Sequence, residues 1–290
     1  MVLKCLPCLD SDGMSEGRRR ELDISRDLAR NLGHSALEAA RAGFYVSEDG
    51  NHVDWSRLVQ EAQRGKVSIA PNQLLPQTRP RQFVKTWVQV TNESTLGASR
   101  RLVESGHKPM ALNFANGIHA GGGFLSGARA QEEVLCRSSA LFQTITGDIM
   151  YKEHRQRPQP DSTAWAIFSP DVPVFRTDDG TTLEHPWLLN ILTCAAPYAP
   201  AIGQPESGDL LHARIRRVLA IAEAYRFSAL VLGAWGCGAF KNDIRRTAED
   251  FKTTLEEEYS GAFSDVVFAI TDWSSERRFL GPFREVFADD

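Results

Sequence analysis

Apolar and polar residues alternate in a regular way first at residues 83–91. This segment reads FVKTWVQVT, and its alternation predicts a half-buried β-strand. Residues 228–235 (SALVLGAW) are almost continuously apolar, which is typical of a strand that helices cover on both faces. Shorter apolar runs predict further strands over 110–115, 164–169, 188–194 and 265–271.

Helical spacing describes the segments between these strands. Leu211, Ile215, Val218 and Ala222 recur every three or four residues, which predicts an amphipathic helix over 208–226. Further helices are expected over 94–104, 131–146 and 242–259, and residues 15–41 are rich in helix-favouring Arg, Leu, Glu and Ala. Helices that alternate with apolar strands predict a three-layer α/β/α sandwich.

The pattern also suggests how the chain is divided. Residues 1–14 are expected to be a flexible leader, and 15–82 an N-terminal helical extension in which Pro71, Pro76 and Pro80 interrupt regular structure. Residues 83–290 carry the alternating pattern without an internal repeat or a linker. We therefore expect one main α/β domain over 83–290.

Composition narrows the classes of function. The 290 residues include 33 basic and 37 acidic side chains, a net charge of -4, so no direct binding to nucleic acid is expected. Five scattered cysteines indicate reduced thiols, and hence an intracellular protein, cytoplasmic or, in a eukaryote, nuclear. No apolar run approaches the ~20 residues of a membrane span. We expect a monomer that does not bind membranes and has no metal site.

Two glycine-rich loops follow predicted strands. Residues 116–124 (NGIHAGGGF) and 233–240 (GAWGCGAF) each end a strand of the sheet. Glycine lets successive backbone N–H groups turn toward an anion, so two such loops could hold a pyrophosphate without lysine. Each loop taken alone is equally consistent with an ordinary tight turn.

Two adjacent carboxylates, Glu132 and Glu133, follow the first loop. Acidic residues at the start of a helix stabilise it through the helix dipole, and this is the simpler interpretation. The alternative is that they face the same pocket as the glycines, where an apolar wall would raise a carboxyl pKa and make it a proton donor. Cleavage of a glycosidic bond requires such an acid.

These residues resemble the bacterial-type poly(ADP-ribose) glycohydrolases. The family signature is GGG, a spacer of six to eight residues and then QEE; here Gly121–Gly123 are followed by a seven-residue spacer and by Gln131, Glu132 and Glu133. The segments NFAN (113–116), LCR (135–137), TCAAP (193–197) and GAWGCGAFKND (233–243) are also similar to the family. The resemblance extends over about 16–268.

The resemblance implies a macrodomain-like fold with a mixed central sheet over 83–290, and hydrolysis of poly(ADP-ribose), free or on proteins, to ADP-ribose, mainly from chain ends. It implies that Glu133 is the acid–base residue and that Glu132 binds ribose hydroxyls. No cofactor or metal is implied. The residues expected to bind substrate are Asn116, Gly121, Gly122, Gly123, Gln131, Gly236, Cys237, Gly238, Ala239 and Phe240.

Three other functions remain open. A macrodomain could bind ADP-ribose without cleaving it, or it could remove mono-ADP-ribose. An oxidoreductase is disfavoured, since no acidic residue stands where a dinucleotide ribose would need one. Ala120 replaces the proline that often precedes GGG in the family, and the neighbouring His119 is interpreted as a solvated loop residue. Trp235 and Trp273 are candidates to stack on the adenine.

Overall fold

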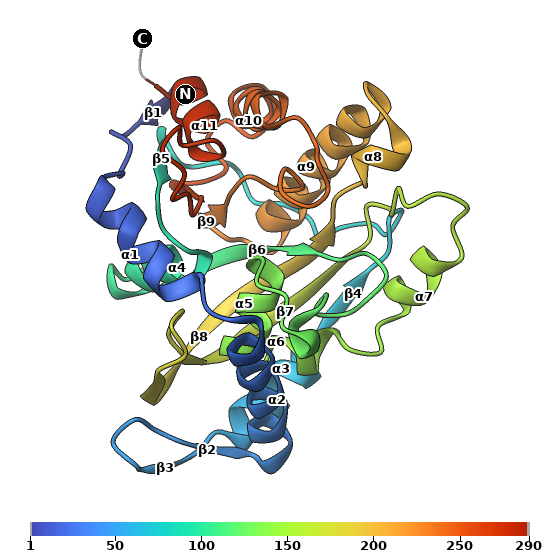
Figure 1. Cartoon of the computed structure of the whole chain (residues 1–290). Coiled ribbons are helices and arrows are strands. Elements are labelled where there is room, and N and C mark those ends of the chain that lie inside the picture. The colour runs from blue at the N-terminus through green and yellow to red at the C-terminus, as the bar shows by residue number, and fades with distance from the viewer. Residues whose placement is uncertain (1, 289–290) are drawn as a thin grey trace.

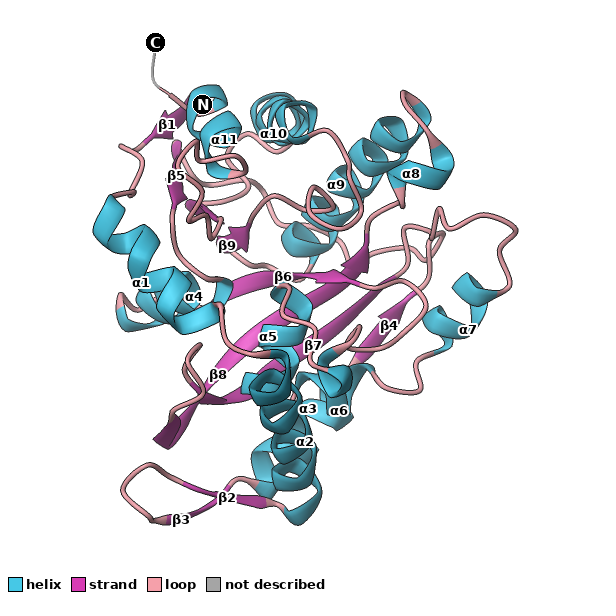
Figure 2. Cartoon of the chain, viewed as in Figure 1, coloured by secondary structure: helices cyan, strands magenta, loops and turns pink. Residues whose placement is uncertain are grey.

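An eight-stranded sheet forms the centre of the structure, a computed structural model that describes residues 2–288 (Figures 1 and 2). The strands are β1 (Val2–Cys5), β2 (Phe44–Val46), β3 (His52–Asp54), β4 (Val67–Ile69), β5 (Lys85–Thr91), β6 (Pro109–Ala115), β7 (Ala166–Arg176), β8 (Thr182–Ala195), β9 (Ala229–Leu232) and β10 (Asp265–Ala269). β2 and β3 pair only with each other, as a small antiparallel sheet.

Helices cover both faces of the sheet. They are α1 (Asp12–Leu22), α2 (Arg26–Ala42), α3 (Ser56–Gly65), α4 (Thr95–Glu104), η1 (Phe124–Ser126), α5 (Gln131–Ser138), α6 (Leu141–Ile145), α7 (Ile149–Arg155), α8 (Ala199–Ile202), α9 (Glu206–Ala224), α10 (Ile244–Thr253), η2 (Thr254–Glu258) and α11 (Leu280–Val286). None of the helices described between residues 2 and 288 has the length and apolar character that a membrane crossing requires.

The sheet has the order β1-β5-β10-β9-β6-β8-β7-β4. Neighbours from β1 to β8 pair in parallel, whereas β7 runs antiparallel to β8, and β4 antiparallel to β7. The expectation of a three-layer α/β/α sandwich with a mixed central sheet is therefore confirmed.

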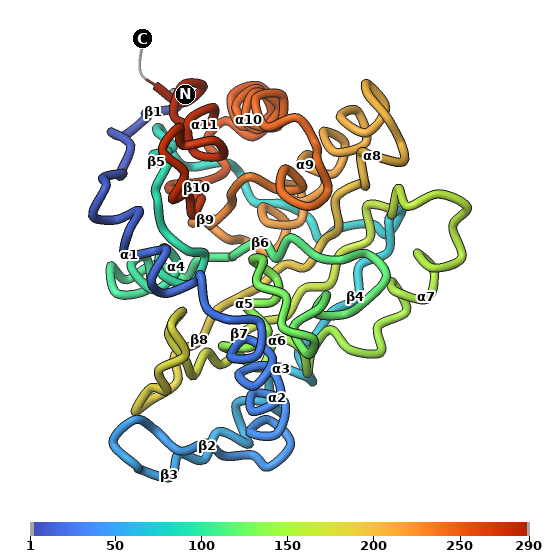
Figure 3. The backbone as a smooth tube through the Cα atoms, viewed as in Figure 1, coloured from blue at the N-terminus to red at the C-terminus, as the bar shows by residue number. Residues whose placement is uncertain are grey.

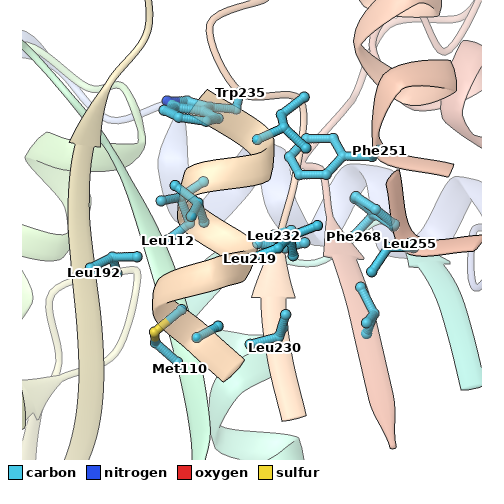
Figure 4. Packing of buried hydrophobic residues seen from close by; sticks show 14 of the residues in the cluster. Met110, Leu112, Leu192, Leu219, Leu230, Leu232, Trp235, Phe251, Leu255 and Phe268 are labelled. Atoms are coloured by element: carbon cyan, nitrogen blue, oxygen red, sulfur yellow. The ribbon is translucent and has the colours of Figure 1, made fainter. Parts of the chain in front are cut away.

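The side chains of the central strands alternate between two apolar layers. Met110 and Leu112 of β6 pack with Leu219 of α9 in one layer, which Figure 4 shows at close range. Ala111, between them, belongs to the other layer with Leu135 of α5. All five side chains are at most 1% exposed. Because both faces of β6 are buried, its sequence is almost wholly apolar.

The segments expected to be a flexible leader (1–14, of which residue 1 lies outside the described residues) and an N-terminal helical extension (15–82) both contribute strands to the main sheet. β1 pairs with β5, with Leu3 opposite Thr86, and β4 pairs with β7, with Ile69 opposite Ala166. Both edges of the sheet therefore come from the first seventy residues, whose path can be followed in Figure 3. Strands of three and four residues are too short to show a period in the sequence.

Two predicted helices are interrupted. The helix expected over 131–146 ends at Ser138, because Ser139 is extended (φ -146°, ψ 176°) and forms a β-bridge with Val174; α6 then begins at Leu141. The helix expected over 242–259 is α10, followed by a π-helical turn at η2. The apolar face continues across both interruptions, so the periodicity did not reveal them.

Candidate active site

A cavity of about 450 Å³ lies at the carboxyl ends of β6, β9 and β10. Residues 114–116, 234–236 and 269–271, which end or follow these strands, line it. Ligands of open α/β sheets bind at this edge, and the volume is within the range of about 300–1,000 Å³ for small-molecule sites. We call this space the central cavity.

The start of α5 is fixed to β6 by Gln131. Its Oε1 accepts a 2.9 Å hydrogen bond from the N–H of Phe114, and its Nε2 donates to the carbonyl of Leu112 (2.7 Å) and to Oγ1 of Thr95 (3.1 Å). Gln131 lines the central cavity, but both ends of its amide group are bonded within the protein. Gln131 was expected to bind substrate. Its hydrogen bonds instead favour a role in positioning α5.

Glu132 is held by groups in β6 and directly after it. Its Oε2 accepts a 2.7 Å hydrogen bond from the N–H of Asn116, and its Oε1 accepts a longer one, 3.4 Å, from Nδ2 of Asn113. The side chain is 3% exposed, and this burial raises the pKa of Glu132 to about 8. The two hydrogen bonds stabilise the ionised form and lower the pKa, but their effect is smaller than that of burial. Glu132 therefore holds a proton at neutral pH.

Glu133 has one bonded and one unbonded carboxyl oxygen. Oε1 accepts a 3.0 Å hydrogen bond from the N–H of Gly123, whereas Oε2 is buried and has no hydrogen-bond partner among the described residues. The side chain is 8% exposed and lines the central cavity. A buried polar atom without a partner is costly in a folded protein, so Oε2 is available to a ligand.

Gly122 brings the two carboxyls together. A Cβ atom there would lie 2.3 Å from Oε1 of Glu133 and 3.1 Å from Oε2 of Glu132, so both carboxyls pack directly against its main chain. The φ angle of Gly122 is +55° and that of Gly121 is +72°, in the region that favours glycine. The three-glycine segment is thus shaped by the two glutamates.

Asn116 shapes the beginning of the same loop. Its Oδ1 accepts 3.0 Å hydrogen bonds from the N–H groups of Ile118 and His119, which forms an Asx turn directly after β6. Its own N–H is the donor to Glu132. Asn116 therefore holds both the loop and the glutamate while it lines the central cavity.

The loop after β9 forms the opposite wall. Gly236, Gly238, Ala239 and Phe240 line the central cavity, but the thiol of Cys237 points into the protein, 3.5 Å from Oγ1 of Thr247. Burial raises the pKa of Cys237 to about 12, so this thiol stays protonated. The backbone N–H of Cys237 is also bonded within the loop, since it donates a 3.2 Å hydrogen bond to the carbonyl of Ala234.

Asn242 braces this loop from behind. Its Nδ2 donates to the carbonyls of Pro197 (2.9 Å) and Gly236 (3.1 Å), and its Oδ1 accepts a 2.6 Å bond from Ser207. A Cβ on Gly236 would come within 2.8 Å of that Nδ2, whereas a Cβ on Gly238 would meet nothing within 4 Å. Gly236 is thus required by packing, and Gly238 keeps the cavity wall open.

The structure separates the expected substrate-binding residues into three groups. The central cavity is lined by Asn116, Gln131, Glu132, Glu133, Gly236, Gly238, Ala239 and Phe240. Gly122 and Gly123 line a neighbouring hollow, on the other side of the loop. Gly121 and Cys237 line neither of these two spaces.

The end of the central cavity beside β10 is aromatic. Both tryptophans line the central cavity. Trp235 is fully buried and belongs to the core, whereas Trp273 is 40% exposed. Leu22 of α1 and Phe279 also line this end. Neither residue was predicted from the sequence, because neither lies near a glycine loop or another motif.

Helix α2 supports the glycine loop from outside the central cavity. Nε of Arg26 donates a 2.9 Å hydrogen bond to the carbonyl of Ser126. A Cβ on Gly33 would lie 2.5 Å from the carbonyl oxygen of Phe124, and one on Gly127 would lie 2.2 Å from that of Arg26. Gly33 in α2 and Gly127 directly after η1 are the sequence signal that could have revealed how closely the two segments approach.

In the part of the chain that the structure describes, no group of three or more His, Cys, Asp or Glu side chains is placed to hold a metal ion.

Comparison with known proteins identifies relatives of the chain. The family model of the microbial-type PARG catalytic domain matches residues 33–177. Poly(ADP-ribose) glycohydrolase from Thermomonospora curvata is 37% identical with a TM-score of 0.84, over 90% of this chain and 99% of that one. The same enzyme bound to the inhibitor ADP-HPD gives 36% and 0.82, over 89% and 99%.

A second bacterial enzyme is also similar. Poly(ADP-ribose) glycohydrolase from Deinococcus radiodurans, in complex with ADP-ribose, is 38% identical with a TM-score of 0.73, over 79% of this chain and 96% of that one. A comparison with curated protein sequences gives no match. Sequence identity at this level over most of both chains shows a shared family and not only a shared fold. The chain belongs to the microbial-type poly(ADP-ribose) glycohydrolases.

Proposed function

We propose that the chain hydrolyses the ribose–ribose bonds of poly(ADP-ribose), with Glu133 as the acid–base residue. As a member of its family it is a glycosidase. The observation that carries the assignment to Glu133 is its carboxyl geometry: Oε1 is fixed by Gly123, and the buried Oε2 has no partner. A proton donor needs one oxygen held by the protein and the other free to meet the leaving group.

The reaction needs only this carboxyl and water. Glu133 donates its proton to the ribosyl oxygen of the leaving polymer as the bond from that oxygen to the anomeric carbon breaks. The Glu133 carboxylate then accepts a proton from a water molecule, whose oxygen bonds to the anomeric carbon. ADP-ribose and a polymer one unit shorter are released, and Glu133 is protonated again.

Glu132 would hold the ribose that is attacked. Its high pKa gives it a proton at neutral pH, so it can both donate to and accept from a ribose hydroxyl. Phe240, which packs edge-on to Tyr198 at 5.7 Å, offers a fixed aromatic wall for the same sugar.

The diphosphate would lie along the loop after β9. This loop offers backbone N–H groups in place of lysines, and Gly238 leaves the space in front of it empty. Of the described cavity-lining residues, Arg129 is the only Lys or Arg, and it is already paired with Asp23 at 2.9 Å. Backbone donors therefore suit the diphosphate better than side-chain cations do.

Adenine would bind at the end beside β10, against Trp273. This placement supports cleavage from chain ends, since an internal unit would need space for polymer beyond the adenosine. Helix α1 and the segment around Arg277 close that end, and Arg277 pairs with Asp10 (2.8 Å) and Asp12 (3.0 Å). The Arg277 and Asp10 side chains are only 11% and 10% exposed, so water screens their attraction little.

The cellular location and the oligomeric state are two further proposals. The buried, protonated thiols of Cys194 and Cys237 suit a reducing compartment, so we place the enzyme inside the cell. One chain supplies both walls of the central cavity, so we expect activity as a monomer. Light scattering at the concentration of the activity assay measures the oligomeric state directly.

Release of ADP-ribose from defined substrates tests the proposal. The chain is incubated with automodified poly(ADP-ribose) and, separately, with mono-ADP-ribosylated protein, and released ADP-ribose is quantified. We expect rapid release from the polymer. Release from the mono-modified protein alone would make the chain a mono-ADP-ribosyl hydrolase, and binding of ADP-ribose with no release from either substrate would make it a binding module.

A further inference from the structure

A second hollow lies directly behind the glycine segment of the active site. Its volume is about 770 Å³, and it is lined by Ile118, His119, Gly123, Ile149, Lys152 and Arg155, among others. We call it the α7 hollow. The loop and α7 are joined there, since Nη1 of Arg155 donates a 2.7 Å hydrogen bond to the carbonyl of Ile118. In Figure 1 the loop after β6 extends toward α7 before it returns to α5.

The α7 hollow and the central cavity have no lining residue in common, but they adjoin at one contact. Gly123 lines the hollow, while its N–H holds the Glu133 carboxyl that lines the cavity. A polymer unit that leaves the anomeric carbon over the glycine segment would therefore lie next to the hollow.

The exposed charges of the α7 hollow are basic. Lys152 and Arg155 are both exposed, and Lys152 makes no ion pair or hydrogen bond with any residue in 2–288. Asp148 is the only acid among the described lining residues, and it is neutralised by Lys66 at 2.8 Å and buried. The hollow therefore attracts anions although the net charge of the chain is negative.

The α7 hollow also offers surface for a nucleoside. Ile118 and Ile149 line it and are 39% and 51% exposed, so they give the hollow an apolar surface. Tyr151 lines it too, and its buried hydroxyl has no hydrogen-bond partner among the described residues. Cations beside apolar surface and an unsatisfied hydroxyl match a ligand that carries phosphates, a base and sugar hydroxyls.

We propose that the α7 hollow binds the ADP-ribose unit on the leaving side of the scissile bond, with Lys152 and Arg155 beside its diphosphate. The proposal rests on the proposed function, because it takes that unit to be the next one of the polymer. It assigns to this chain two binding regions on either side of Gly121–Gly123. Free ADP-ribose fills the central cavity alone, whereas polymer fills both.

Charge changes at Lys152 test this subsite. Lys152→Glu and Lys152→Gln are compared with the wild type for kcat and KM on polymer, at low and high salt, and for the Kd of free ADP-ribose by calorimetry. We expect KM to rise about tenfold for Lys152→Glu and about threefold for Lys152→Gln at low salt, and these differences to shrink in about 0.5 M salt. The Kd of ADP-ribose should stay within about twofold of the wild type.

Lys108→Glu is the matched control. Lys108 is also exposed and unpaired among the described residues, but it precedes the first residue of β6, at the opposite end of that strand from the site. The same charge change there should leave KM unchanged. An equal rise of KM in Lys108→Glu would overturn the subsite, because it would report only the net charge of the protein.

The remaining outcomes are also decisive. A wild-type KM in Lys152→Glu, or an equal loss of polymer and ADP-ribose affinity, contradicts the subsite while the enzyme activity stands. If the wild type releases no ADP-ribose, the proposed function fails instead. Filter binding of intact polymer then tests the α7 hollow alone, and equal binding by the wild type and Lys152→Glu would overturn it.

Discussion

The backbone N–H of Gly123 donates a 3.0 Å hydrogen bond to Oε1 of Glu133. A side-chain donor in that place would bring its own freedom of movement, whereas this N–H is fixed in a loop that α2 supports from outside. The bond leaves Oε2 as the carboxyl oxygen without a partner among the described residues. With Glu133 as the proposed acid–base residue, the backbone would then set the direction of proton transfer.

Replacement of Glu133 by glutamine should separate binding from hydrolysis. Glu133→Gln keeps the shape of the side chain and an oxygen that can accept from Gly123, but it removes the transferable proton. We expect kcat on polymer to fall by about 10³-fold, within the range for loss of a general acid, with the Kd of ADP-ribose nearly unchanged. Wild-type turnover in a release assay would refute the assignment.

Gly122→Ala should misplace both carboxyls at once. Its Cβ would lie 2.3 Å from Oε1 of Glu133, and displacement of a reacting group by about 1 Å can cost about 100-fold in rate. The control is Gly106→Ala, where φ is +87° but a Cβ meets nothing within 4 Å. Backbone strain is similar in both variants, so equal activities would show that contact with Glu133 is unimportant.

Gly238→Glu should repel the diphosphate. A side chain at this position enters open space, so the protein should fold normally while a negative charge is placed in the cavity wall. We expect the Kd of ADP-ribose to rise roughly tenfold or more by calorimetry, and less for the uncharged Gly238→Gln. If both variants bind ADP-ribose as tightly as the wild type, the diphosphate lies elsewhere.

Trp273→Ala should weaken binding through the adenine end. Stacking of a base on an aromatic ring contributes about 1–3 kcal/mol, so we expect the Kd of ADP-ribose to rise roughly tenfold while kcat changes little. Trp87→Ala is the control, because Trp87 is 42% exposed, close to the 40% of Trp273, and lies outside the cavity on β5. Similar losses in both variants would speak against stacking at Trp273.

Glu132 should make folding stability depend on pH. Its pKa of about 8 in the folded protein is above the ordinary value of 4.5, so the folded state binds more protons than the unfolded state between these values. This contribution is fully present below about pH 4.5 and is lost as pH rises through about 8. Glutamine does not titrate, so the Glu132→Gln variant lacks this pH-dependent contribution to stability.

Urea unfolding at pH 5.5, 6.5 and 7.5 measures this effect. Relative to Glu132→Gln, the unfolding free energy of the wild type should fall by about 1.4 kcal/mol per pH unit across this window. A constant difference between the two proteins would show that Glu132 is ionised in the folded state at all three pH values.

The site was more predictable from sequence than the edges of the sheet. Glu133 and the two glycine loops lie within short segments, where spacing along the chain determines which groups meet. Gln131 was placed correctly next to them, but its partners Thr95 and Leu112 are distant in sequence, so its role as a brace could not be foreseen.

The β10 end of the cavity shows the limit of local patterns. Leu22 and Phe279 line it from opposite ends of the chain, and the ion pair of Arg277 with Asp10 that joins those ends spans 267 positions. No spacing rule connects residues so far apart. Such contacts follow from the complete sheet, which in turn depends on two edge strands that carry no periodic signal.

Those edge strands have a consequence for any shortened form of the protein. A version that starts at residue 83 would keep both glycine loops and both glutamates, yet it would lose β1 and β4 and leave the backbone edges that they cover on β5 and β7 without a partner strand. Exposed margins of this kind pair with other molecules. The excised domain would therefore be prone to aggregate, and its inactivity would report on solubility rather than on catalysis.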